Sequence, residues 1–225
     1  MVSRGAASGL SLRYLFDPLC GWCYGAAPLI DRLAVHLQGV PGTGLSLAPT
    51  GLFSGSGARR MDAGFADYAW ANDVRIAQLT GQRFSERYRR EVLGQIGASF
   101  DAGPAYLALS AVALTAPERE LEALRHIQQA RYIEGLDITA RPPLVELLQA
   151  HGLHAAAERL QAADADLLAL EAQRREQSQA LMRDLGLHGV PALVCETPAG
   201  RRVIRGQALY GEFSELLAEL GLAQA

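Results

Sequence analysis

The chain has 225 residues, of which 49% are hydrophobic and 20% are charged, and this composition excludes a mainly disordered protein. Its 21 basic and 24 acidic residues give a formal net charge of −3 at pH 7, so it lacks the basic surplus typical of proteins that bind nucleic acid. All 21 basic residues are arginine, which excludes Schiff-base chemistry at a lysine and a phosphate-binding loop that depends on lysine.

The first fifty residues predict a strand, a helix and a second strand. Residues 10–16 place apolar side chains at every second position, which is typical of a strand with one buried face. From about Gly21 to Leu37, leucines recur every four residues, as in an amphipathic helix. Residues 45–50 predict the second strand, with Pro49 at its end. This order of elements is typical of a parallel βαβ unit.

Residues 58 to about 186 are predicted to be almost entirely helical. Helix starts in this block are marked by a capping serine, by a proline in a first turn and by the capping-box spacing of Thr115-Ala116-Pro117-Glu118. The helices that we expect cover 59–79 (ended by Gly81), a short segment from Ser85 to Leu93, a segment that begins near Pro104, a segment that begins at Thr115, the segment from Pro142 to Gly152, and the segment from about Asp164 to Leu185.

Strand signals return after the helical block. Residues 191–196 and 201–205 flank the sequence TPAG, which is typical of a hairpin turn. Residues 209–220 then place apolar side chains on one side of a last helix. The chain therefore predicts an α/β domain made of residues 1–57 and 187–225, interrupted by a helical insertion at 58–186.

Two of the three cysteines, Cys20 and Cys23, have the spacing C-x-x-C at the junction of the first strand and the first helix. Unpaired N–H groups and the helix dipole favour negative charge at a helix start, and therefore the thiolate that acts as nucleophile in disulfide exchange. Cys20 lies at this start and is the expected nucleophile. Cys23 lies nearly one turn later and suits a shielded, resolving thiol. The third cysteine, Cys195, is expected to be a buried strand residue.

The segment from Asp17 to Gly25, DPLCGWCYG, resembles, over its positions up to Tyr24, the D-x-x-C-x-W-C-Y-x-G signature of the DsbA-like family of thiol–disulfide oxidoreductases, in the cytoplasmic FrnE-like and protein-disulfide isomerase branch. Val190-Pro191 matches the family's cis-proline position. The resemblance spans nearly the whole chain and implies an α/β, thioredoxin-like fold with a large all-helical insertion. It also implies that Cys20 is the nucleophile and Cys23 the resolving cysteine. Pro191 would pack beside the dithiol, and Val190 would offer backbone hydrogen bonds to a substrate.

The chain departs from thioredoxin and from DsbA itself at two places. Trp22 stands between the cysteines where a histidine or proline is common, and it is expected either to contact the substrate as a partly exposed apolar side chain or to pack in the core. Tyr14 occupies the position at which thioredoxin and DsbA carry a buried acid. Asp17 is the nearest carboxylate, so proton transfer to Cys23 is expected to use Asp17, water or neither.

These observations predict a thiol–disulfide oxidoreductase or isomerase that exchanges disulfides with protein or small-thiol substrates, glutathione among them, through the C-G-W-C dithiol. The dithiol itself carries the two electrons, so no metal, nucleotide or flavin cofactor is expected. Reduction, oxidation and isomerisation all stay open, because the direction depends on the reduction potential. A zinc site is disfavoured, because the sequence has no second C-x-x-C and no H-x-x-x-H pair.

Two other classes of function stay open. A glutathione-dependent transferase or isomerase of the kappa or 2-hydroxychromene-2-carboxylate isomerase type shares the architecture, but it typically has serine at the position of Cys20. A peptide-binding chaperone module would use the helical insertion as a groove. His188 is expected to be a loop residue, with a contact to the dithiol as the alternative.

Neither a membrane-spanning segment nor a secretory signal is predicted. The uncharged and largely apolar stretch between Asp101 and Glu118 falls short of the roughly 20 apolar residues that a span needs. Residues 1–9 are expected to be a short tail. The protein is therefore predicted to be cytoplasmic, with no membrane or nucleic-acid partner.

Overall fold

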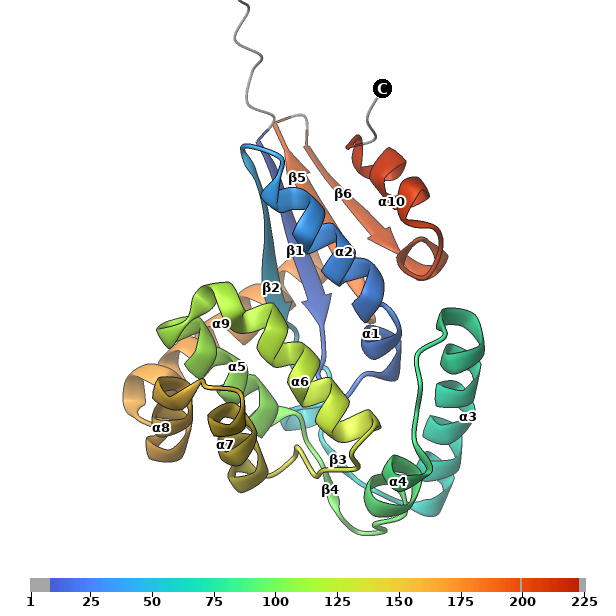
Figure 1. Cartoon of the computed structure of the whole chain (residues 1–225), viewed down its shortest axis with the longest axis vertical. Helices are drawn as coiled ribbons and strands as arrows, with labels where there is room; N and C mark the ends of the chain where they lie inside the picture. Colours follow the sequence, from blue (N-terminus) through green and yellow to red (C-terminus); the bar gives the residue numbers. More distant parts are fainter. Residues whose placement is uncertain (1–8, 199, 223–225) are drawn as a thin grey trace, which may run out of the picture.

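The computed structural model describes residues 9–198 and 200–222, with a four-stranded mixed sheet at its centre (Figure 1). The strand β1 pairs in parallel with β2 and antiparallel with β5, and β5 pairs antiparallel with β6. The predicted βαβ unit and hairpin are therefore confirmed, although Ala199 of the hairpin turn lies outside the described residues. The order across the sheet is β2 (Thr43–Pro49), β1 (Leu10–Phe16), β5 (Ala192–Thr197) and β6 (Gly200–Arg205).

Helices cover both faces of the sheet, because successive side chains of a strand point to opposite faces. Leu12 and Tyr14 of β1 pack in the same core as α2 (Ala27–Gln38) and α10 (Phe213–Leu220), which Figure 1 shows on one face. Leu15 of β1 packs instead in a second core with Leu181 and Met182 of α9 (Ala165–Asp184). The strands are thus buried on two sides.

The segment between β2 and β5 carries helices α3 to α9, of which α9 packs against the sheet. Helix α5 is buried from Ala105 to Val112, because other helices pack around it. Figure 1 shows α5 to α8 gathered near one end of the sheet, whereas α3 lies beside α1 (Gly21–Gly25). The helices are α3 (Ala63–Thr80), α4 (Glu86–Tyr88) with a π-helical turn at Arg89–Leu93, α5 (Gly103–Thr115), α6 (Glu120–Tyr132), α7 (Arg141–Ala150), α8 (His154–Ala162) and α9.

The helix predicted over 59–79 begins later than expected, at Ala63. The short strand β3 (Arg59–Arg60) occupies the preceding positions and pairs antiparallel with β4 (Ser99–Phe100). Asp62 then caps α3, and its Oδ1 accepts the N–H of Phe65 at 2.8 Å. The predicted end is confirmed, since Gly81 follows α3 with a φ of 74°, a value that glycine adopts without strain.

The capping box predicted at Thr115 is wrong. Thr115 is the last residue of α5, and its hydroxyl donates to the carbonyl of Ala111 at 2.8 Å. A 3-10 turn, Pro117–Arg119, follows and leads into α6. A threonine hydroxyl that donates to a carbonyl of the preceding turn does not cap the next helix. The spacing of the motif alone therefore gave a wrong prediction.

Three further differences concern helix bounds. The predicted helix from Gly21 to Leu37 divides at Ala26 into α1 and α2. Helix α8 lies within the block predicted to be almost entirely helical, although no separate helix is predicted for this segment. The last helix begins at Phe213, because Gly206–Leu209 forms a 3-10 turn. The predicted cap at Ser85 is confirmed, since its Oγ accepts the N–H of Tyr88 at 3.0 Å.

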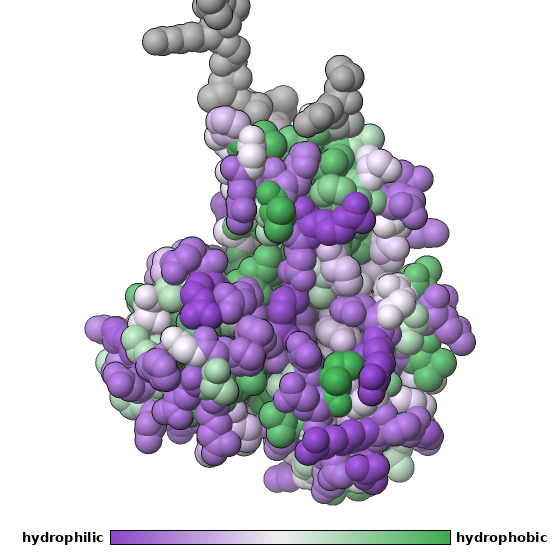
Figure 2. All heavy atoms as spheres, in the orientation of Figure 1, coloured by the Kyte–Doolittle hydropathy of each residue, from purple (hydrophilic) through white to green (hydrophobic). Residues whose placement is uncertain are grey.

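The surface in Figure 2 is mostly hydrophilic over the helices beyond the sheet, with hydrophobic side chains scattered among the polar ones. No helix among residues 9–198 and 200–222 is both long and apolar enough to cross a membrane. The tail expected at residues 1–9 lies outside the described residues except for Gly9.

Candidate active site

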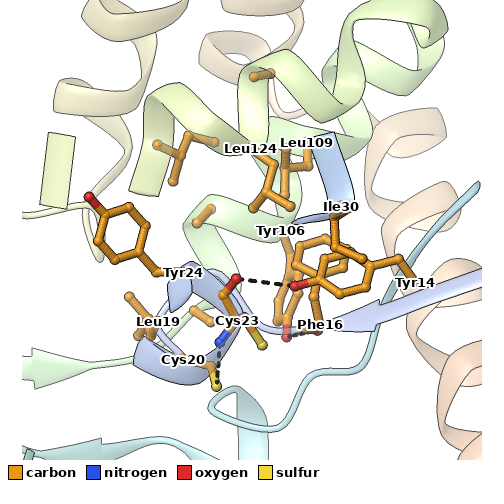
Figure 3. Packing of buried hydrophobic residues seen from close by; sticks show 14 of the residues in the cluster. Tyr14, Phe16, Leu19, Cys20, Cys23, Tyr24, Ile30, Tyr106, Leu109 and Leu124 are labelled. Carbon is orange, nitrogen blue, oxygen red and sulfur yellow. Dashed lines mark hydrogen bonds between the residues drawn. The ribbon is translucent and has the colours of Figure 1, made fainter. Parts of the chain in front are cut away.

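Cys20 is placed at the start of α1 by a tight turn that follows β1. The backbone N–H of Cys20 donates to the carbonyl of Asp17 at 3.1 Å, and the N–H of Leu19 donates to Asp17 Oδ1 at 2.7 Å. Cys20 then adopts the extended conformation of an N-cap, and its Sγ accepts the N–H of Cys23 at 3.4 Å (Figure 3). The sulfur therefore caps the helix in place of a side-chain oxygen.

The two cysteines differ in exposure. Cys20 is 7% exposed, whereas Cys23 is fully buried, and both are free thiols. Burial raises the pKa of the Cys23 thiol well above its usual value, and the hydrogen bond with Cys20 and the charge on Cys20 add to this effect. The geometry thus gives a nearly buried sulfur that borders a cavity at the helix start, and a fully buried, protonated sulfur three residues later. Cys195 is buried in β5, as predicted.

The peptide bond between Val190 and Pro191 is cis, which confirms the sequence-based expectation. It brings the loop before β5 to the dithiol, where the Cys20 thiol donates to the carbonyl of Val190 at 3.7 Å. Pro191 is buried and Val190 is half-buried. His188 is exposed in the same loop.

Trp22 is half-buried and lies against Tyr210, with ring centroids 5.3 Å apart. Burial raises the pKa of Tyr210, and the charges of Cys23 and Cys20 raise it further, so this ring lies close to the dithiol. Sequence reasoning did not identify Tyr210, because it comes from the segment between β6 and α10 and carries no motif of its own.

Asp17 precedes Cys20 by three residues and is fully buried. Its Oδ2 accepts the N–H of Phe53 at 2.9 Å and the hydroxyl of Tyr106 at 2.7 Å. Burial raises the pKa of Asp17 to about 6, although these hydrogen bonds oppose the rise. The charge of Asp17 in turn raises the pKa of Cys23, so the two groups interact. Tyr106, on α5, has no signal in the sequence that links it to the dithiol.

Tyr14 occupies the position at which an acid is expected from the family pattern. Its hydroxyl donates to the backbone carbonyl of Cys23 at 3.1 Å, as Figure 3 shows, and its ring stacks on Phe16. Burial is the main cause that raises the pKa of Tyr14 well above its usual value, so its hydroxyl stays protonated. Tyr14 therefore holds α1 against β1, and Asp17 is the carboxyl whose charge acts on the Cys23 thiol.

A cavity of about 130 Å³ opens beside Cys20. Asp73 of α3 reaches into it, is only 4% exposed, and accepts a hydrogen bond from the hydroxyl of Tyr88 at 3.0 Å. No group of three or more His, Cys, Asp or Glu side chains suited to a metal ion occurs in the part of the chain that the structure describes. The lining residues are Leu19, Cys20, Gly21, Trp22, Phe53, Phe65, Tyr68, Ala69, Asn72, Asp73, Ile76, Tyr88, Phe100 and Tyr132.

Solved structures share this architecture over nearly the whole chain. The cytosolic disulfide reductase DsbM from Pseudomonas aeruginosa is 33% identical, covers 95% of this chain and 100% of its own, and superposes with a TM-score of 0.79. The chain belongs to the DsbA-like family of thiol–disulfide oxidoreductases. No protein-family model and no curated protein matches this DsbA-like chain.

Two further structures extend the comparison of this DsbA-like protein. The structure of the Pseudomonas aeruginosa DsbM with GSH is 33% identical, covers 94% of this chain and 97% of its own, and has a TM-score of 0.77. A Nitrosomonas europaea protein that was proposed to be a disulfide isomerase is 22% identical, covers 94% and 96%, and has a TM-score of 0.75. The latter supports the fold alone. The predicted thioredoxin-like fold and the thiol–disulfide oxidoreductase class are therefore confirmed.

Proposed function

We propose that this protein reduces disulfides of small thiols and proteins through Cys20 and Cys23. The observation that carries the proposal is the position of Cys20, which caps α1 with its sulfur while Cys23 lies buried behind it and Val190 lies beside it. A helix start favours the thiolate, which is the reacting form in exchange. The reducing direction is supported by the 33% identical neighbour, which is named a cytosolic disulfide reductase.

The exchange has two steps. The Cys20 thiolate attacks one sulfur of the substrate disulfide, the substrate S–S bond breaks, and its electron pair leaves on the other sulfur. Cys23 then loses its proton and attacks Cys20 Sγ, which releases the second substrate sulfur and leaves a Cys20–Cys23 disulfide. We assign Asp17 as the group that takes the Cys23 proton, because its carboxyl is buried, its charge acts on this thiol and its pKa is about 6.

The groups around Cys20 suit an extended substrate segment. We assign the backbone of Val190 to hydrogen bonds with the substrate, Pro191 to the wall beside the sulfur, and Trp22 to an apolar contact. Glutathione is a candidate partner, because the neighbouring DsbM was solved with GSH. The name of that neighbour also supports a cytoplasmic location for this chain.

A trapping experiment tests the proposal. The substitution Cys23→Ala removes the resolving thiol. Reaction of this variant with glutathione disulfide is therefore expected to leave one glutathionyl group on Cys20. Mass spectrometry of the intact protein and of its peptides detects this adduct. The wild-type protein is expected to resolve this adduct. Cys195→Ala is the matched control, because it removes a buried cysteine outside the motif and is expected to behave as wild type.

Two results would contradict the proposal. One is an adduct that forms equally well in the Cys20→Ala variant. The other is an adduct that persists as long in the wild-type protein as in the Cys23→Ala variant, because Cys23 would then have no resolving role.

A further inference from the structure

Asp73 lies directly against the C-G-W-C motif, although it comes from the middle of α3. A Cβ placed on Gly21 would lie 2.4 Å from Asp73 Oδ1, a separation that real Cβ atoms do not show. The absence of a side chain at Gly21 is therefore what allows the carboxyl to approach the backbone next to Cys20. Asp73 and Cys20 line the same cavity.

The two oxygens of Asp73 are used differently. Oδ2 accepts the hydroxyl of Tyr88 at 3.0 Å, whereas Oδ1 makes no hydrogen bond to any residue within 9–198 and 200–222. Oδ1 is not among the fully buried side-chain atoms that lack a partner in the described residues, so it keeps contact with solvent although the residue is only 4% exposed. Asp73 as a whole lines the cavity beside the nucleophile.

The charged and titratable groups that face Asp73 come from three elements: Cys20 at the start of α1, Tyr88 on α4, and Arg131 and Tyr132 on α6. Burial raises the pKa of Asp73 to about 7, although the Tyr88 hydroxyl and the Arg131 charge oppose the rise. A substantial fraction of Asp73 therefore carries a proton near neutral pH.

We propose that Asp73 is a catalytic acid of this reaction, which donates a proton from Oδ1 to the substrate sulfur that leaves when Cys20 attacks. The inference rests on the proposed exchange at Cys20. The Cys20–substrate S–S bond forms, the substrate S–S bond breaks with its electron pair on the leaving sulfur, and the Asp73 proton converts that thiolate to a thiol. Water at the open mouth of the cavity returns a proton to the carboxylate.

Asp73 and Asp17 thereby act in different steps of the exchange. Each oxygen of Asp17 already accepts a hydrogen bond from the protein, and Asp17 does not line the cavity. Asp73 lines the cavity, and only its Oδ2 accepts a hydrogen bond within the described residues. A thiolate leaving into this apolar and aromatic cavity is poorly solvated, so a nearby acid lowers the barrier to its release.

The test compares two disulfides whose leaving groups differ in their need for a proton. Glutathione disulfide releases a basic alkyl thiolate, whereas dithiodipyridine releases a stable thiolate that leaves without an acid. Single-turnover rates of the reduced protein are measured by stopped flow at pH 6, where Asp73 is mostly protonated. Asp73→Asn then keeps the shape and the acceptor for Tyr88, and removes only the proton that can be donated.

Asp73→Asn is expected to slow the reaction with glutathione disulfide about 100-fold and to change the rate with dithiodipyridine by about 2-fold or less. Asp67→Asn, an exposed carboxylate on the same helix, is the matched control and is expected to leave both rates unchanged. Equal slowing of both reactions by Asp73→Asn, or no slowing of either, would overturn the inference. A wild-type protein whose Cys20 reacts with neither disulfide would overturn the proposed exchange itself, which separates the two failures.

Discussion

Asp17 shows how burial and hydrogen bonding compete at a single carboxyl. The folded protein raises its pKa to about 6, above the value of about 3.9 for an unfolded chain. The folded state therefore holds the proton more tightly than the unfolded state. As a result, ionisation of Asp17 lowers the free energy of unfolding progressively as the pH rises from about 4 to about 6. The whole of this loss of stability is present above this range.

Tyr106→Phe tests this balance, because it removes the hydroxyl that donates to Asp17 Oδ2 and accepts from the N–H of Gly51 at 2.9 Å. A hydrogen bond from this hydroxyl stabilises the ionised carboxylate of Asp17 more than its neutral acid. We expect a loss of about 2 to 3 kcal/mol in the free energy of unfolding at pH 8 and about 1 kcal/mol at pH 4, measured by urea denaturation. Tyr68→Phe, at a side chain that is 66% exposed, should change neither value. An equal loss at both pH values would refute this account.

At the scale of elements, the site depends on how closely α3 approaches α1. Two glycines of α1 face this helix: a Cβ on Gly21 would meet Asp73, and a Cβ on Gly25 would lie 2.6 Å from Cγ2 of Ile76. Interiors are close-packed, so extra atoms at such a contact push the two helices apart. The C-x-x-C motif is thus held in place by a helix that lies forty residues or more further along the chain.

Gly21→Ala is expected to lower the free energy of unfolding by about 2 kcal/mol, measured by urea denaturation, because its Cβ overlaps the Asp73 carboxyl. In an Asp73→Ala background the same change should cost about 1 kcal/mol or less, since the overlapping oxygens are gone. Gly44→Ala is the control, because a Cβ there would meet no atom within 4 Å. A Gly21→Ala cost that is the same in both backgrounds would argue against this contact.

At the scale of the whole molecule, Arg174 of α9 joins the sheet to the helices beyond it. Its side chain is 13% exposed and forms an ion pair with Glu120 of α6. It also donates to Ser110 Oγ of α5 at 3.2 Å and to the carbonyl of Leu47 in β2 at 3.4 Å. The division into residues 1–57 and 187–225 against 58–186 stays our proposal, and the bond from Arg174 to Leu47 crosses it.

Glu120→Ala leaves the Arg174 charge without its partner, so we expect a loss of about 3 kcal/mol in the free energy of unfolding. The double replacement Glu120→Leu with Arg174→Met should cost less than this single change, because no buried charge remains unpaired. Glu86→Ala breaks an exposed pair with Arg89 and should cost about 0.5 kcal/mol or less. Urea denaturation followed by fluorescence is the measurement, and a double variant less stable than Glu120→Ala would contradict the prediction.

Local sequence patterns were sufficient to predict most of the secondary structure and the position of the dithiol. Period-two and helical spacings predicted the sheet and most helices, and the C-x-x-C after a strand placed Cys20 at a helix start. The match of Val190-Pro191 to the family's cis-proline position predicted the cis bond. The strands and the helix start follow from neighbouring residues, because strand pleating and helix capping act over only a few positions.

Only the tertiary structure decided which distant groups surround the dithiol. Asp73 and Asp67 are alike in the sequence, yet one is buried against Gly21 and the other is exposed. Tyr106 and Tyr210 reach the site from elements that no spacing connects to Cys20. Their roles depend on burial and on contacts between remote elements, and burial shifts the pKa of a carboxyl by an amount that sequence position does not encode.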